Sequence, residues 1–331
     1  MDETVVVTGA SAGVGRAVAL EFARKGRRVA LLARGRDRLE SAALEAKALG
    51  AEVLAIEADV ADAAGVEAAA ERIERELGPI DTWVNNAMVT VFGPVKDLTA
   101  EEFRRVTEVT YLGQVHGTLA ALRRMRPRNR GTIVQIGSAL SYRAIPLQSA
   151  YCAAKFAVRG FTDALRSELE HERSAIRLSM VQLPAVNTPQ FDWARNLMGR
   201  KAQPVAPIFQ PEAIAREVVR AAREAPRELW IGRSALKAII GSMLLPLVGD
   251  HILSSEGYSG QLTNQPTEIG AGNLFDPPSG DPGSHGRFDG HAEPTVTGFD
   301  PVALRAAALV VSLTGVFALV GGAFALGRRR R

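Results

Sequence analysis

Short apolar runs alternate with longer segments of helical spacing along the first two thirds of the chain. The apolar runs lie at residues 4–7, 29–32, 53–56, 82–84, 132–136 and 176–183. The segments with apolar side chains three and four apart lie at residues 39–49, 66–77 and 151–172. A further helix is predicted to begin at Thr99, because Thr99 and Glu102 have the spacing of a capping box. This alternation predicts βαβ units.

Repeated βαβ units predict an α/β fold with a doubly wound parallel sheet of the Rossmann type, covered by helices on both faces. We expect a single domain at residues 1–253. Its last part, residues 233–253, is a candidate membrane-interface segment, because it contains the apolar run AIIGSMLLPLVG. That run has only 12 residues and contains Pro246, so a full membrane span is not predicted there.

Two later regions break the alternating pattern. Residues 257–301 contain nine glycines and six prolines, which favours an extended, poorly ordered linker over residues 254–305. Residues 306–326 carry no charge and are long enough for a transmembrane helix, followed by a basic tail at 327–331. The alternative is a buried C-terminal helix, and the side of the membrane that the terminal arginines face stays open.

Composition and charge narrow the classes of function. The chain has 331 residues, 47% hydrophobic and 23% charged, which is typical of a folded globular protein. Its formal charge of +4 equals the contribution of the four terminal arginines, and no basic stripe predicts a nucleic-acid partner. A single cysteine, Cys152, and five histidines without ligand spacing predict no metal site. The start of the chain lacks a secretory signal, so we expect the domain in the cytoplasm.

The first predicted strand runs into a glycine-rich turn and then into a helix. The turn carries the candidate phosphate-binding residues Gly9, Ser11, Gly13, Val14 and Gly15. In this position glycines let the backbone approach a pyrophosphate, and free amides at the helix start face the anion. The second strand ends at Arg34, where an NAD-binding protein would have an acidic residue. Arginine there suits a 2′-phosphate, so NADP(H) is preferred over NAD(H).

Tyr151 and Lys155 lie four residues apart in a predicted helix and therefore share one face. An ammonium group close to a phenol stabilises the phenolate and lowers the tyrosine pKa. The pair is therefore a candidate for general acid/base chemistry.

These motifs together resemble the short-chain dehydrogenase/reductase family. The matching pieces, over residues 1–232, are Thr8-Gly9-x-x-x-Gly13-x-Gly15, Asp59-Val60, Asn85-Asn86-Ala87, Ser138 and Tyr151-x-x-x-Lys155. The resemblance implies an oxidoreductase that interconverts a carbonyl and an alcohol by hydride transfer. It also implies a homo-oligomer.

The resemblance implies a role for each matching residue. Tyr151 would be the general acid/base, Ser138 would hold the reacting oxygen, and Lys155 would bind the nicotinamide ribose and lower the pKa of Tyr151. Thr110 stands where the family has a proton-relay asparagine. The remaining cofactor-binding residues implied are Asp59, Val60, Asn86, Ala87, Pro184 and Thr188.

The substrate prediction rests on an apolar segment and on the membrane prediction. Residues 187–211 are rich in aromatic and aliphatic side chains and carry three prolines, which is consistent with an apolar lid. Together with a membrane-attached chain, this favours a lipophilic carbonyl or alcohol. Departures from the family pattern at Met88, Thr110 and Ala185 keep an alternative open: a non-catalytic dinucleotide-binding redox sensor or a membrane scaffold.

Overall fold

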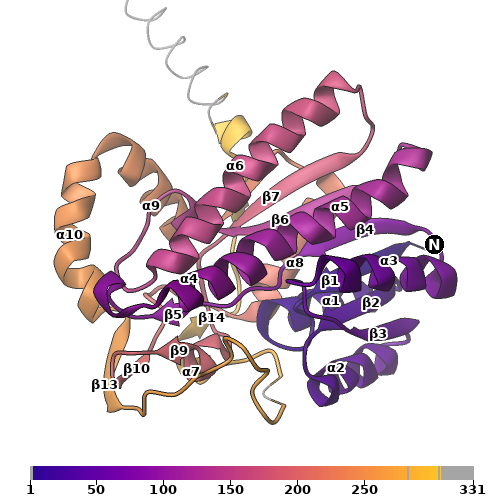
Figure 1. Ribbon diagram of the computed structural model, residues 1–331. Coiled ribbons are helices and arrows are strands. Elements are labelled where there is room, and N and C mark those ends of the chain that lie inside the picture. Colours follow the sequence, from indigo (N-terminus) through magenta and orange to yellow (C-terminus); the bar gives the residue numbers. More distant parts are fainter. Residues whose placement is uncertain (1–2, 282, 305, 307–331) are drawn as a thin grey trace, which may run out of the picture.

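An eight-stranded sheet forms the centre of the computed structural model, which describes residues 3–281, 283–304 and 306 (Figure 1). In spatial order its strands are β15 (Gly298–Phe299), β12 (Glu228–Ile231), β7 (Arg177–Leu183), β6 (Thr132–Ser138), β4 (Ile80–Asn85), β1 (Thr4–Thr8), β2 (Arg28–Ala33) and β3 (Val53–Glu57). Seven strands are parallel, and only β15 pairs antiparallel, with β12. The strands predicted from the apolar runs are confirmed.

Two layers of helices cover the sheet and bury its two faces. On one face lie α1 (Gly13–Arg24), α2 (Arg36–Ala48) and α8 (Pro211–Glu224). On the other face lie α3 (Ala63–Leu77), α4 (Ala100–Thr107), α5 (Gly113–Met125) and α6 (Ser149–His171). Because strands such as β1 are buried on both sides, their central residues are consecutively apolar instead of alternating with polar ones. The doubly wound α/β fold is therefore confirmed.

The predicted capping box begins α4. The Thr99 hydroxyl accepts a hydrogen bond from the backbone N–H of Glu102, and the Glu102 carboxylate accepts one from the backbone N–H of Thr99. Glu102 also pairs with Arg195 at 2.9 Å, which ties α4 to β9 (Arg195–Asn196). This contact holds a point inside the apolar segment 187–211 that was predicted as a lid.

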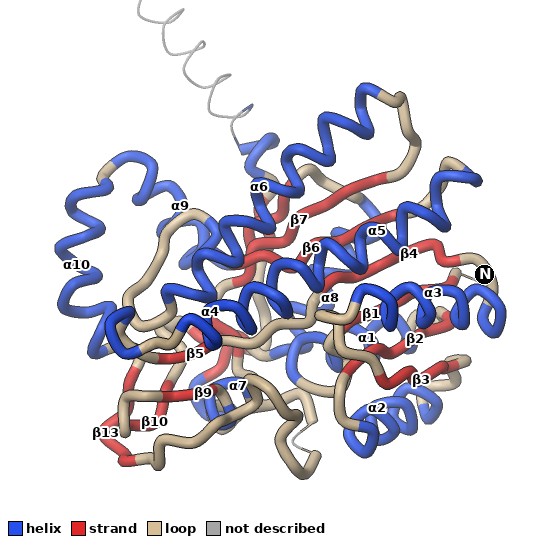
Figure 2. The backbone as a smooth tube through the Cα atoms, viewed as in Figure 1, coloured by secondary structure: helices blue, strands red, loops and turns tan. Residues whose placement is uncertain are grey.

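Residues 257–301 do not form the extended linker that their composition predicted. They return to the domain and pair in three places: β13 (Leu262–Pro266) with β10 (Arg200–Ala202), β14 (Ala292–Glu293) with β11 (Ile208–Phe209), and β15 with β12. Leu274 is 0% exposed and belongs to the core. The prediction of a poorly ordered linker from glycine and proline content was therefore wrong. A few buried apolar side chains and backbone pairings are enough to order this segment. Figure 2 shows its loops beside α7 (Gln190–Trp193).

The candidate membrane-interface segment forms a helical hairpin, α9 (Gly232–Leu244) and α10 (Pro246–Ser259), that projects from the domain (Figure 1). Its turn exposes large apolar side chains, with Leu244 71% and Leu247 81% exposed. The predicted helix at 306–326 and the basic tail at 327–331 lie outside the described residues, apart from residue 306. Among the described helices, none has the length and apolar character needed to cross a bilayer.

Candidate active site

A cavity of about 530 Å³ opens at the carboxyl ends of the central strands. It lies where the strand order reverses between β1 and β4, the usual ligand position of a doubly wound sheet. Most of the site residues predicted from sequence line it: Gly9, Ser11, Gly13, Val14, Gly15, Arg34, Asp59, Val60, Asn86, Ala87, Ser138, Tyr151, Lys155, Pro184 and Thr188. Of the predicted set, only Thr110 does not.

Close packing explains the glycines after β1. Gly9 has φ +67°, and a Cβ there would lie 2.8 Å from the Cα of Ala87. A Cβ on Gly15 would lie 2.2 Å from the Gly9 carbonyl oxygen and 2.4 Å from the side-chain nitrogen of Asn86. Asn86 in turn donates to the Thr8 carbonyl oxygen at 2.9 Å. The loop is therefore held against the end of β4 in a shape that side chains would prevent.

The start of α1 suits a phosphate. The helix begins at Gly13, and its N-cap, Ala12, has no side chain that accepts hydrogen bonds from the first turn. The Gly13 N–H donates to the Gly283 carbonyl oxygen at 3.1 Å, which leaves the amides of Val14 and Gly15 for an anion in the cavity, and the helix dipole favours negative charge there. The glycine cradle and the uncapped helix start together fit the pyrophosphate of a dinucleotide.

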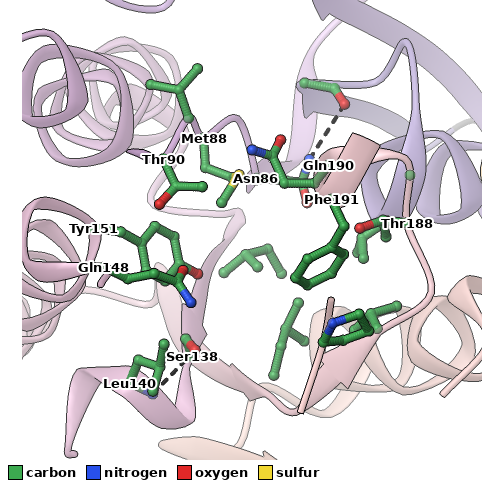
Figure 3. Close-up of a pocket in the computed structure, with 18 of the residues that line it drawn as sticks. Asn86, Met88, Thr90, Ser138, Leu140, Gln148, Tyr151, Thr188, Gln190 and Phe191 are labelled. Atoms are coloured by element: carbon green, nitrogen blue, oxygen red, sulfur yellow. Dashed lines mark hydrogen bonds between the residues drawn. The ribbon is translucent and has the colours of Figure 1, made fainter. Parts of the chain in front are cut away.

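Ser138, Tyr151 and Lys155 lie together at the other part of the cavity. Ser138 ends β6, and Tyr151 and Lys155 occupy successive turns of α6. Figure 3 shows Tyr151 and Thr90 on one side of the cavity, Phe191 on the opposite side and Ser138 below them. The Ser138 oxygen accepts the backbone N–H of Leu140 at 3.1 Å, which fixes its position at the end of the strand.

The pKa of Tyr151 shifts in the direction opposite to the prediction. Burial raises it above its ordinary value, although the neighbouring Ser138 hydroxyl acts against the rise. Burial lowers the pKa of Lys155 to about 7. The Lys155 ammonium donates to the Ile136 carbonyl oxygen at 2.6 Å and lies 5.6 Å above the Tyr151 ring. Lys155 thus lies over the face of the Tyr151 ring, and burial is the largest cause of the shift in the Tyr151 pKa.

Thr110 is not part of the same cluster. It lies in a π-helical turn, Glu108–Leu112, and is 0% exposed. Its hydroxyl accepts the Val89 N–H at 3.0 Å and donates to the Val89 carbonyl oxygen at 2.9 Å. Both bonds hold its side chain to Val89, between β4 and β5 (Val91–Phe92), so the Thr110 hydroxyl is not among the groups that line the cavity.

The adenosine end of the cavity is lined by Arg34, Asp59 and Val60. Although burial acts against it, the Arg105 guanidinium keeps the pKa of Asp59 below its ordinary value, through a hydrogen bond of 2.5 Å. Asp59 also accepts the backbone N–H of Ala61 at 2.9 Å, so its carboxylate stabilises the turn after β3. Arg34 contacts the C-terminal segment, described below.

Several lining residues were not predicted. Thr90 is 1% exposed and its hydroxyl has no hydrogen-bond partner among the described residues, while Gln148 binds Gln261 at 2.7 Å. Arg38 also lines the cavity. None of these residues stands in a sequence motif, and only the turns of the folded chain bring them to the cavity.

Comparison with known proteins identifies the family. Residues 3–196 match the short chain dehydrogenase family. The chain belongs to this family. The short-chain dehydrogenase fold and the resemblance inferred from the motifs are thereby confirmed.

Individual relatives extend over more of the chain. The uncharacterized oxidoreductase YxnA of Bacillus subtilis is 32% identical over 268 residues, which cover 80% of this chain and 75% of YxnA. The 3-ketodihydrosphingosine reductase of Bos taurus is 30% identical over 224 residues, covering 65% of this chain and 67% of the reductase. An alcohol dehydrogenase of the archaeon Thermococcus sibiricus, solved with 5-hydroxy-NADP, has a TM-score of 0.60 and 30% identity, covering 70% of this chain and 96% of that chain.

This short-chain dehydrogenase is an NAD(P)-dependent oxidoreductase, as its family and relatives indicate. Its cofactor is a nicotinamide dinucleotide, for which the glycine loop and the start of α1 provide a suitable cradle. The enzyme interpretation therefore takes precedence over the redox sensor and the scaffold.

Proposed function

We propose that this short-chain dehydrogenase interconverts a lipophilic carbonyl compound and its alcohol with NADP(H), and that Tyr151 is the general acid/base. The observation that carries the proposal is the convergence of Ser138, Tyr151 and Lys155 on one cavity that also reaches the glycine loop. A cofactor on that loop and a substrate beside Tyr151 would share this space.

The residues divide the chemistry between them. A bound nicotinamide supplies or accepts the hydride at the substrate carbon. The Tyr151 hydroxyl donates a proton to the carbonyl oxygen in reduction, and burial, by raising its pKa, keeps it protonated at neutral pH. Ser138 donates a hydrogen bond to the same oxygen and orients it. Lys155, held by Ile136, borders the place of the nicotinamide ribose.

Apolar side chains support a lipophilic substrate. Beyond Tyr151 the cavity is lined by Met88, Phe92, Leu140, Ile145, Phe191, Val205, Ala238 and Leu253. Phe191 packs against Phe92 and Phe288 with ring centres 6.1 and 5.9 Å apart. The Bos taurus relative is named for 3-ketodihydrosphingosine, and a relative from Rattus norvegicus is a 17-beta-hydroxysteroid dehydrogenase.

We also propose that the chain is membrane-attached with its catalytic domain in the cytoplasm. Support comes from the uncharged residues 306–326 and from the exposed apolar side chains of the α9–α10 hairpin. Ala238 of α9 and Leu253 of α10 also line the cavity, so the hairpin would lie between a bilayer and the substrate site. The homo-oligomer implied by the family resemblance stays a prediction.

The test uses the full chain, purified in detergent, with wild type and Tyr151→Phe compared on a ketone series of increasing alkyl length. We expect NADPH to support turnover, kcat/KM to rise with chain length, and the variant to lose roughly 10²- to 10⁴-fold in kcat. Unchanged NADPH affinity in the variant shows that only proton transfer is lost. Equal turnover of short hydrophilic ketones would refute the lipophilic assignment, and full activity of the variant would refute the role of Tyr151.

A further inference from the structure

Arg34, predicted as the 2′-phosphate residue, binds the C-terminal segment instead. Its guanidinium donates to the carbonyl oxygens of Asn273 at 2.7 Å and of Phe275 at 2.5 Å. Leu274, between them, is fully buried in the core, and its carbonyl oxygen also accepts a bond from Arg105 at 3.1 Å. The donors of Arg34 are thus directed at backbone oxygens and not at an anion.

From this anchor, residues 273–281 and 283–289, here named the belt, run along the outer side of the dinucleotide site. Pro277 packs against Gly35 after β2, and Asp281 binds Arg16 of α1 at 2.5 Å. Further along, the Gly283 carbonyl oxygen accepts the Gly13 N–H of the glycine loop at 3.1 Å. The belt ends at the loop after β7, where the Asn187 side chain accepts the Phe288 N–H at 3.0 Å.

Arg38, in the first turn of α2, has the properties expected of an anion ligand. Its side chain is only 6% exposed and lines the cavity together with Arg34 and Pro277. Within the described part of the chain its guanidinium has no hydrogen bond or ion pair, and its contact is the face of the Trp193 ring at 5.2 Å. The guanidinium therefore lines the cavity with donors that a bound anion could use.

The surrounding charges leave this place open to a phosphate. Asp281 is the nearby acid, and it already binds Arg16 and the Ser41 hydroxyl, the latter at 2.5 Å. Arg38 also lies close to the turn that follows β2, because a Cβ on Gly35 would be 3.1 Å from an Arg38 terminal nitrogen. The end of β2 is where a dinucleotide fold reads the adenosine ribose.

We propose that Arg38 binds the 2′-phosphate of NADP(H), whereas Arg34 fastens the belt that forms the outer wall of the site. This inference rests on the proposed use of NADP(H). It assigns two different effects to two arginines four residues apart: Arg38 gives selectivity for the phosphate, and Arg34 gives affinity for any dinucleotide that the belt covers.

The test measures the dissociation constants of NADPH and NADH for the full chain in detergent, with 2′,5′-ADP as a competitor. In Arg38→Met we expect NADPH to bind roughly 10- to 100-fold more weakly, because a charge-assisted contact is lost, while NADH affinity changes less than about twofold. In the same variant, 2′,5′-ADP should compete more weakly, by a similar factor. Arg36→Met is the matched control, since Arg36 is an exposed residue of the same helix turn that pairs with Glu40 at 3.2 Å.

In Arg34→Met we expect NADPH and NADH to lose affinity by the same factor and to dissociate faster. Arg38→Lys keeps the charge and should retain part of the NADPH preference. This partial rescue, together with melting temperatures equal to that of wild type, shows that the variants fold correctly. Selective loss of NADPH in Arg34→Met, or a preserved preference in Arg38→Met, overturns the inference while the use of NADP(H) stands. If wild type itself does not prefer NADPH, the proposed cofactor fails first.

Discussion

At the scale of single residues, Lys155 combines a buried ammonium with one backbone partner. It is 1% exposed, and burial lowers its pKa to about 7, whereas a lysine of the unfolded chain keeps a pKa near 10.4. Between these values the unfolded chain holds a proton that the folded chain has released. The free energy of unfolding therefore rises with pH over this interval. Below about pH 7 both states are protonated, and the buried ammonium lowers the free energy of unfolding by its full amount.

This argument predicts the behaviour of Lys155→Met. The variant should be more stable than wild type at pH 6, and the difference should shrink toward pH 10 by up to about 1.4 kcal/mol per pH unit. Urea unfolding of both proteins between pH 6 and pH 10 measures it. The exposed Lys96→Met variant is the control for loss of a lysine at the surface. A difference that does not change with pH would contradict a buried ammonium that titrates near 7.

At the scale of elements, local sequence signals determined where a helix such as α4 begins, and long-range contacts determined which distant segment it packs against. The capping box of α4 could be predicted from a stretch of four residues, because its two partners are neighbours in the chain. The contact of Glu102 with Arg195, 93 residues away, could not be predicted from the sequence. The same carboxylate thus caps α4 and holds the segment that leads into the cavity wall.

For α4 we predict that Thr99→Ala lowers the free energy of unfolding by about 1 kcal/mol, since the Glu102 N–H loses its acceptor. Denaturant unfolding measures this loss. Thr107→Ala is the matched control at the other end of the helix, where the hydroxyl only donates to the Phe103 carbonyl oxygen within the helix. An equal loss in both variants would show that the cap contributes nothing specific.

At the scale of the whole molecule, the last third of the chain completes the domain that the first two thirds begin. It supplies the edge strand β15, the belt and the exposed α9–α10 hairpin. A fragment that ended at residue 253 would lose the buried Leu274 and all belt contacts to α1 and β2. We therefore expect cofactor binding to require the chain up to residue 289.

Membrane attachment is tested by a chain that ends at residue 304. We expect the full chain to stay in the membrane pellet after an alkaline carbonate wash, and the shortened chain to be released, because it lacks the uncharged residues 306–326. NADPH affinity should be equal in the full and the shortened chain, since both keep the belt. This equal affinity is the control for correct folding. Release of the full chain by carbonate, or retention of the shortened chain, would count against a span at 306–326.

By itself, the sequence determined the α/β layers, the glycine loop and the Ser138, Tyr151 and Lys155 set. The layers, the glycine loop and the Tyr151–Lys155 pair depend on period, local turn chemistry and short spacings, which act between near neighbours, whereas Ser138 came from the family resemblance. Only the tertiary structure decided the direction of the Tyr151 pKa, the binding of the Thr110 hydroxyl to Val89 and the pairing of β13, β14 and β15 with the domain. It also decided that Arg34 binds the belt, whereas Arg38 contacts the Trp193 ring and has no polar partner among the described residues. Burial and partner choice depend on groups hundreds of residues apart, as between Arg34 and Asn273, and no local pattern encodes which of them meet.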